Sequence, residues 1–78
     1  MILVNTDFIS GKEIETIQLV RGVEMEYYPA DATQLAEQKL IDGAKSLGAD
    51  AVVNVQYAIQ EFKKVCVVIV SGTAVKFI

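Results

Sequence analysis

The chain has 78 residues, one cysteine, no histidine and a net charge of −3, and 53% of its residues are hydrophobic. This length predicts a single domain over residues 1–78 with a small interior. The composition excludes an internal disulfide and a zinc site built from cysteine and histidine, and the acidic balance argues against nucleic-acid binding. Association of subunits is then the remaining usual way to stabilise so small a domain.

The apolar segments are too short to cross a membrane. The longest uninterrupted apolar run, Val65 to Val70, is far shorter than the roughly 20 residues of a spanning helix. The first residues, MILVNTDF, lack the basic region and the cleavage site of a signal peptide. A free thiol without a targeting segment fits a reducing compartment. We therefore expect a cytoplasmic protein with no membrane contact.

Residues 1–28 predict two strands. MILV (1–4) is a short apolar strand, and a loop with turn-forming residues follows it. From Glu13 the chain alternates with a period of two, which is typical of a half-buried strand. One face carries Ile17, Leu19, Val23, Met25 and Tyr27, and the other carries Thr16, Gln18, Glu24 and Glu26. Arg21 interrupts the apolar face, and Gly22 beside it indicates a bulge or a close backbone approach.

A helix is predicted after Pro29. Asp31 and Gln34 have the spacing of a capping box at its start. Mostly small residues form one stripe at helical spacing, which lets the helix lie close to a sheet. This stripe comprises Ala32, Ala36, Leu40, Gly43, Ala44 and Leu47. Gly48 is the expected residue after the helix end, where a positive φ is needed.

The last third predicts an antiparallel hairpin. In the first of its strands Val53, Val55, Tyr57 and Ile59 face one way, and Asn54, Gln56 and Gln60 face the other. EFKK forms the turn, and Val65–Val70 is apolar on both faces, as in a strand covered on both sides. The predicted fold is therefore α+β, in the order β-β-α-β-β, with one helix packed on a mostly antiparallel sheet. Since no other element can cover the second face of the last strand, we expect a neighbouring subunit to do so.

The sequence offers little catalytic chemistry. Without histidine no nucleophile–base pair can be built around one, and the carboxylates are spread along the chain. Glu24 and Glu26 share a strand face and could pair, but a solvated sheet face explains them better. Arg21 is interpreted as the partner of a carboxylate, either Asp50 or a strand glutamate, in preference to an anion-binding residue. We predict no enzyme, no catalytic residue and no cofactor.

Cys66 is the one candidate metal ligand. Its apolar neighbours favour a packing role, because a thiol in such surroundings is inert. The alternative requires a symmetric assembly, in which one Cys66 from each subunit forms a ring of thiols able to bind a soft metal or selenium.

Four segments resemble the YbjQ-like family, whose members are often labelled heavy-metal-binding. They are NTDFISGKEI (5–14), VRGV (20–23), LGADAVVNVQY (47–57) and SGTAVKF (71–77). The resemblance implies a small α+β subunit related to the dodecin subunit. It also implies a homo-oligomer, namely a cyclic pentamer in which strands of neighbouring subunits join in a ring. We therefore expect a non-enzymatic, ring-forming protein of unknown ligand.

The sequence departs from the family in three places. YYPADATQ is short where members commonly carry a longer, basic and glycine-rich segment between the second strand and the helix. Ser10 replaces a usual proline, and Asn54 stands where glycine is frequent. Any site in the longer segment is therefore absent from this chain.

Overall fold

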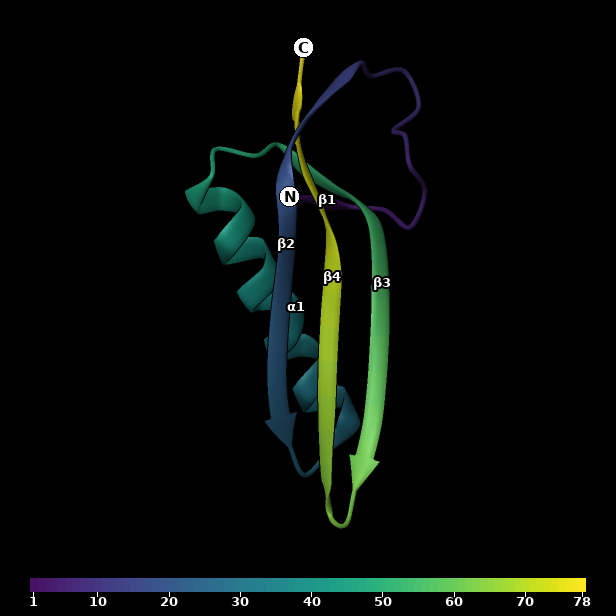
Figure 1. Ribbon diagram of the computed structural model, residues 1–78, viewed down its shortest axis with the longest axis vertical. Helices are drawn as coiled ribbons and strands as arrows, with labels where there is room; N and C mark the ends of the chain where they lie inside the picture. Colours follow the sequence, from purple (N-terminus) through teal and green to yellow (C-terminus); the bar gives the residue numbers. More distant parts are fainter.

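The computed structural model describes all 78 residues as one sheet and one helix. The elements are β1 (Ile2–Leu3), β2 (Ile14–Glu26), α1 (Pro29–Ser46), β3 (Ala51–Phe62) and β4 (Val65–Phe77). The strand order is β1-β3-β4-β2, in which β4 pairs antiparallel with both long neighbours and β1 pairs parallel with β3. This arrangement confirms the predicted α+β class and the order β-β-α-β-β (Figure 1).

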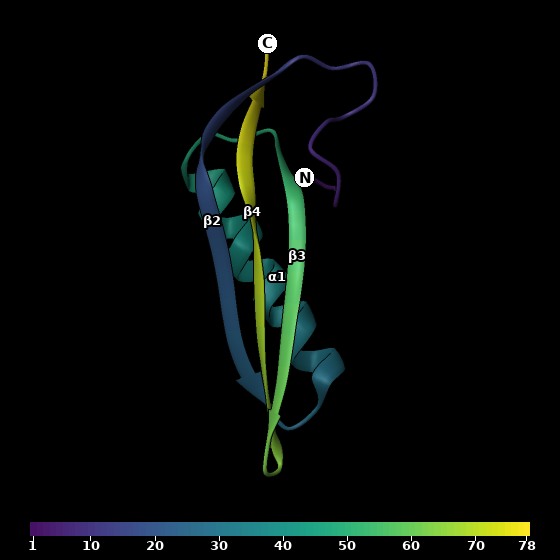
Figure 2. The same ribbon diagram turned by 45° about the vertical axis from the view of Figure 1, so that its right-hand side comes forward.

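The helix α1 crosses one face of the sheet, behind β2 and β4, and no helix covers the other face (Figures 1 and 2). The main core lies between them and comprises Val20, Ala32, Ala36, Leu40, Ala44, Val52, Val55, Val68, Val70 and Ala74. The predicted stripe of small residues thus supplies the buried side of the helix. The helix is not apolar enough to span a membrane.

Gly22 is the place where the helix comes closest to the sheet. A Cβ at this position would overlap the carbonyl oxygen of Ala36 and lie 2.9 Å from the backbone nitrogen of Leu40. The close approach predicted for Gly22 is therefore confirmed, and the bulge of β2 lies elsewhere. Any side chain at Gly22 would push α1 away from the sheet.

The second face of the sheet is partly covered by the chain's own N-terminal segment. Ala51, Val53 and Val75 form a small second cluster there, and Val4, Ile9, Ile14 and Phe77 pack against it. The expectation that no element of this chain covers the second face of the last strand was wrong at this end. The loop after β1 folds back and removes Val75 from water, which its polar composition did not predict.

Two irregularities move side chains from one face of the sheet to the other. The register of β2 against β4 shifts between Thr16 and Gln18, so Ile17 packs on the helix side while Leu19 lies on the opposite face. The register of β3 shifts between Val53 and Gln56, which separates Val53 from Val55. Simple alternation therefore assigned one residue in each strand to the wrong face, namely Ile17 in β2 and Val53 in β3. In each strand the bulge adds one residue, which reverses the alternation beyond it.

The start of the helix differs from the prediction, whereas its end agrees with it. The helix begins at Pro29, two residues before the predicted capping box, and Tyr28 at the N-cap forms no side-chain cap. Proline suits the first position because its missing N–H needs no partner. At the other end Gly48 has φ 76°, its N–H donates to Lys45 O (3.0 Å), and Ala49 N–H donates to Ala44 O (3.1 Å). These bonds form a Schellman motif, so the role predicted for Gly48 is confirmed.

Candidate functional site

The sheet face opposite α1, called the open face below, carries side chains that the single chain leaves in water. The paired registers place on it Leu19, Arg21, Val23 and Met25 from β2, Val65, Val67, Ile69, Ser71 and Thr73 from β4, and Gln56, Ala58 and Gln60 from β3. Leu19 is 78% exposed and Met25 is 59% exposed. The apolar alternation of β2 therefore points away from the helix, where the chain provides no cover.

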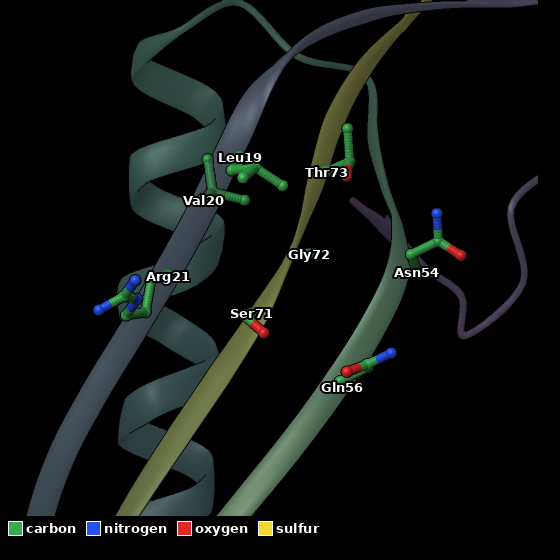
Figure 3. A pocket seen from close by; sticks show the side chains of 8 residues that line it. All are labelled: Leu19, Val20, Arg21, Asn54, Gln56, Ser71, Gly72 and Thr73. Atoms are coloured by element: carbon green, nitrogen blue, oxygen red, sulfur yellow. The ribbon is translucent and has the colours of Figure 1, made fainter.

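A row of three polar residues crosses the middle of the open face. Arg21 on β2 lies opposite Ser71 on β4, and Ser71 lies opposite Gln56 on β3. We call these three the polar row. In Figure 3 Arg21 and Gln56 lie on either side of Ser71, each over its own strand. Three hydrogen-bonding side chains are thereby held side by side on a rigid sheet.

A pocket of about 410 Å³ opens at the polar row. Leu19, Asn54 and Thr73 complete its lining (Figure 3). Asn54 has φ 53°, in the left-handed region, and lies within the register shift of β3. A bulge re-aims the side chains of its strand, and bulges are frequent beside binding sites. The alternation of β3 in the sequence gives no sign of this irregularity, so sequence reasoning missed the pocket.

Arg21 has no carboxylate partner within the chain. The one salt bridge joins Lys39 Nζ to Glu24 Oε2 at 2.9 Å. The Asp50 carboxylate instead accepts the backbone N–H of Phe77 at 2.8 Å. The predicted pairing of Arg21 with Asp50 or a strand glutamate was therefore wrong within one subunit. Its guanidinium group remains free on the open face.

Glu24 has a structural role. Lys39 donates a hydrogen bond to the carboxylate of Glu24 and another to Val23 O at 3.1 Å, which ties α1 to the end of β2. The hydrogen bond from Lys39 and that from the Met25 N–H hold the pKa of Glu24 below its usual value. A carboxylate that stays ionised and paired does not suit proton transfer. The arrangement gives no support to a catalytic pair with Glu26.

Cys66 lies on the helix side of β4. It is 5% exposed and shares its face with Val68 and Val70, which belong to the main core. Its neighbours in the sheet register are Glu26 and Glu61. The structure holds no group of three histidine, cysteine or acidic side chains that could bind a metal ion. Burial of Cys66 favours the packing interpretation, while its role as a metal ligand stays a prediction.

Tyr57 links β3 to the helix in a way the sequence did not indicate. Its hydroxyl donates to Glu37 Oε1 at 2.9 Å. Partial burial and this bond to a carboxylate raise the pKa of the Tyr57 phenol. Since the phenol serves as a hydrogen-bond donor, the pair holds β3 against α1 as long as Tyr57 stays protonated.

Comparison with known proteins gives relatives along the whole chain. A UPF0145 protein of Clostridium novyi is 43% identical over all of this chain and all of that protein. A UPF0145 protein of Clostridium tetani is 37% identical, over 97% of this chain and 96% of its own length. A protein of unknown function from Pediococcus pentosaceus, of the DUF74 family, has the same fold. Its crystal structure superposes with a TM-score of 0.87 at 18% identity, and the match covers 100% of this chain and 98% of that one.

The alignment with the Clostridium novyi protein runs over 103 positions, which is 25 more than the 78 residues of this chain. That relative therefore carries residues that are missing here. The link between β2 and α1 is brief in this structure, with only Tyr27 and Tyr28 between the two elements. A model of the YbjQ-like family, described as "Putative heavy-metal-binding", matches residues 21–78. Together with the full-length relatives, this match shows that the chain belongs to the YbjQ-like family.

Proposed function

We propose that the protein is a non-enzymatic, ring-forming cytoplasmic protein whose subunits join through their sheet edges and bind a small ligand. The observation that carries this proposal is that the outer edge of β2 is open along its whole length and the outer edge of β3 is open beyond Val55. β2 spans 13 residues and has no strand on its outer side, and the hydrogen bonds of β1 and its loop to β3 end at Val55. Open edges of this length attract further strands.

The directions of the two free strands suit a closed ring. β2 and β3 both run antiparallel to β4, so they run in the same direction as each other. A copy rotated about an axis along the strands would place its β3 beside the β2 of the first copy, as a parallel pair. Such a head-to-tail contact repeats from subunit to subunit and closes if the rotation divides a full turn. The family resemblance implies five subunits.

The apolar part of the open face supports the same assembly. Val23, Met25 and Ile69 are exposed in the single chain. Val23 on β2 lies directly opposite Ile69 on β4, and Met25 is the next residue of β2 on the same face. In a ring the helices need the larger outer circumference, so the open face would turn inward. Burial of this apolar surface would contribute about 25 cal/mol for each Å² removed from water.

Light scattering coupled to size exclusion tests the ring. We expect a mass that is a multiple of the 8.5 kDa subunit, with five as the expected number. Met25→Asp should dissociate the assembly, because it places a charge on the inward face. Phe8→Asp, an equally exposed apolar side chain in the N-terminal loop, is the matched control and should leave the mass unchanged. A subunit mass at micromolar concentration would contradict the proposal.

Soft-metal or selenium binding through Cys66 is the second candidate function, and the description of the family favours it. In this interpretation the thiols of several subunits act together, since one thiol alone makes a poor site. It requires an assembly other than the proposed ring, because that ring turns the helix side of β4, and Cys66 with it, outward. Native mass spectrometry after exposure to Cu(I), Zn²⁺ or selenite tests it. Metal or selenium bound by the parent protein and lost in Cys66→Ala would support this function over the first.

A further inference from the structure

The pocket at the polar row is rich in hydrogen-bond donors and contains no acid. Arg21 contributes a guanidinium group with five N–H donors and no partner in the chain. Gln56 and Asn54 contribute side-chain amides, and Ser71 and Thr73 contribute hydroxyl groups. None of the lining residues is acidic, although the chain as a whole carries a net charge of −3. The pocket is therefore a local site of positive charge on an acidic protein.

The spacing of the donors suits a small anionic group. Adjacent strands lie about 4.8 Å apart, so the backbones at Arg21 and Gln56 are separated by roughly 10 Å with Ser71 midway. In Figure 3 the Arg21 side chain extends away from Ser71, toward the outer edge of β2. Because this side chain is long and exposed, it could turn inward to an oxyanion above Ser71, which Gln56 would approach from the other side. Arginine binds carboxylate and phosphate through two parallel hydrogen bonds, which suits this approach.

We propose that the polar row binds the oxyanion, phosphate or carboxylate, of a small molecule. The pocket volume of about 410 Å³ exceeds that of a single oxyanion and lies within the range of small-molecule sites. Leu19 provides an apolar wall beside the donors, so the ligand carries a short apolar part next to its charge. The donors of the polar row come from three strands of the same sheet, so they are already side by side in a single subunit, and in the proposed ring the pocket would face inward.

Titration followed by ¹⁵N–¹H NMR tests this site. Inorganic phosphate and acetate are added separately at constant ionic strength, with chloride as the balancing anion. We expect saturable shifts of the side-chain amides of Asn54 and Gln56 and of the backbone N–H groups of residues 71–73. If only phosphate causes these shifts, the ligand is a phosphorylated molecule. If acetate causes them as well, the ligand class includes carboxylates.

Variants separate binding at the pocket from a general attraction to positive charge. Arg21→Gln should weaken anion binding tenfold or more, since it removes a charge-assisted bidentate contact. Gln56→Ala should weaken it a few-fold. Lys64→Gln removes one exposed positive charge at the hairpin tip and should leave the affinity unchanged. Light scattering of each variant shows separately whether the assembly is intact, so failure of the ring and failure of the anion site are distinguishable.

Either of two results would overturn the proposal: neither anion causes a saturable shift, or Arg21→Gln titrates like the parent protein. A further measurement then shows what Arg21 does instead, namely whether Arg21→Gln lowers the mass of the assembly. If it does, Arg21 would contact a carboxylate of a neighbouring subunit, and the pocket would be part of a subunit interface.

Discussion

The two faces of β4 are covered in different ways. On the helix side Val68, Val70 and Ala74 are fully buried beneath α1, whose small residues let the two layers approach closely. On the other side the N-terminal segment covers Val75, whereas Ile69 remains 36% exposed. The helix side of β4 is therefore fully buried within one chain, whereas the open face stays partly exposed. An apolar strand in a small protein thus indicates a need for cover without saying which molecule supplies it.

The largest effect should distinguish two adjacent residues on opposite faces. Val68→Asp buries an unpaired charge in the main core and should cost several kcal/mol, comparable with the whole stability of a small domain. Ile69→Asp should cost the subunit only about 1 kcal/mol, and should act mainly by dissociating the assembly. Thermal unfolding and light scattering of both variants measure the contrast. Equal melting temperatures for the two variants would show that the faces are covered alike.

The next contrast compares two glycines near the helix–sheet contact. Gly22→Ala should destabilise the fold by about 1–3 kcal/mol, because the new methyl group meets the backbone of α1. Gly43→Ala lies in α1, where a Cβ would meet nothing within 4 Å, and should stabilise the fold by about 1 kcal/mol. Urea unfolding measures both changes in free energy. A stable Gly22→Ala variant would mean that the helix moves away from the sheet without loss.

The third prediction concerns Cys66, which lies near one end of the helix-covered face of β4. We expect Cys66→Val to change the free energy of unfolding by less than about 1.5 kcal/mol and to leave the assembly intact. The thiol should react slowly with DTNB in the native protein, because it is 5% exposed. Reaction of one equivalent per subunit within seconds would show that the thiol is accessible and would favour the soft-metal function.

The smallest expected effect concerns Tyr57 and Glu37, where the helix-covered face ends. The raised pKa of Tyr57 means that the pair stabilises the fold below about pH 10 and loses this contribution as the pH rises through the pKa of the folded state. Glu37→Gln should lower the pKa of Tyr57, and Tyr57→Phe should make stability less sensitive to alkaline pH. NMR titration of the Tyr57 ring carbons measures the first change, and unfolding at pH 8–11 measures the second. An unchanged pKa in Glu37→Gln would show that the bond to Glu37 is absent in solution.

The sequence predicted the elements well and the faces of the strands less well. The stripe at Ala32, Ala36 and Leu40 identified the buried side of α1, because helical spacing tolerates no insertion within so few turns. The bulges near Ile17 and Asn54 were not predicted, since one extra residue changes the face without changing the composition. For the candidate site, the sequence singled out Arg21 but not the pocket that it lines. The pocket forms because the fold brings β2 and β3 to either side of β4, which the sequence does not state. Arg21 lacks a carboxylate partner because Asp50 accepts the N–H of Phe77 and Glu24 pairs with Lys39.

The short β1 strand has a consequence for how subunits would align. It occupies the outer side of β3 at Ala51 and Val52, and the following loop extends this cover to Val55. An incoming β2 from a neighbouring subunit would meet this obstruction and could pair only with residues 56–62 of β3, about half of its own 13 residues. In the proposed ring, β1 therefore acts as a stop that fixes the stagger between subunits. The stagger and the number of strands together determine the diameter of a closed sheet, so two residues at the start of the chain would help to set the size of the whole assembly.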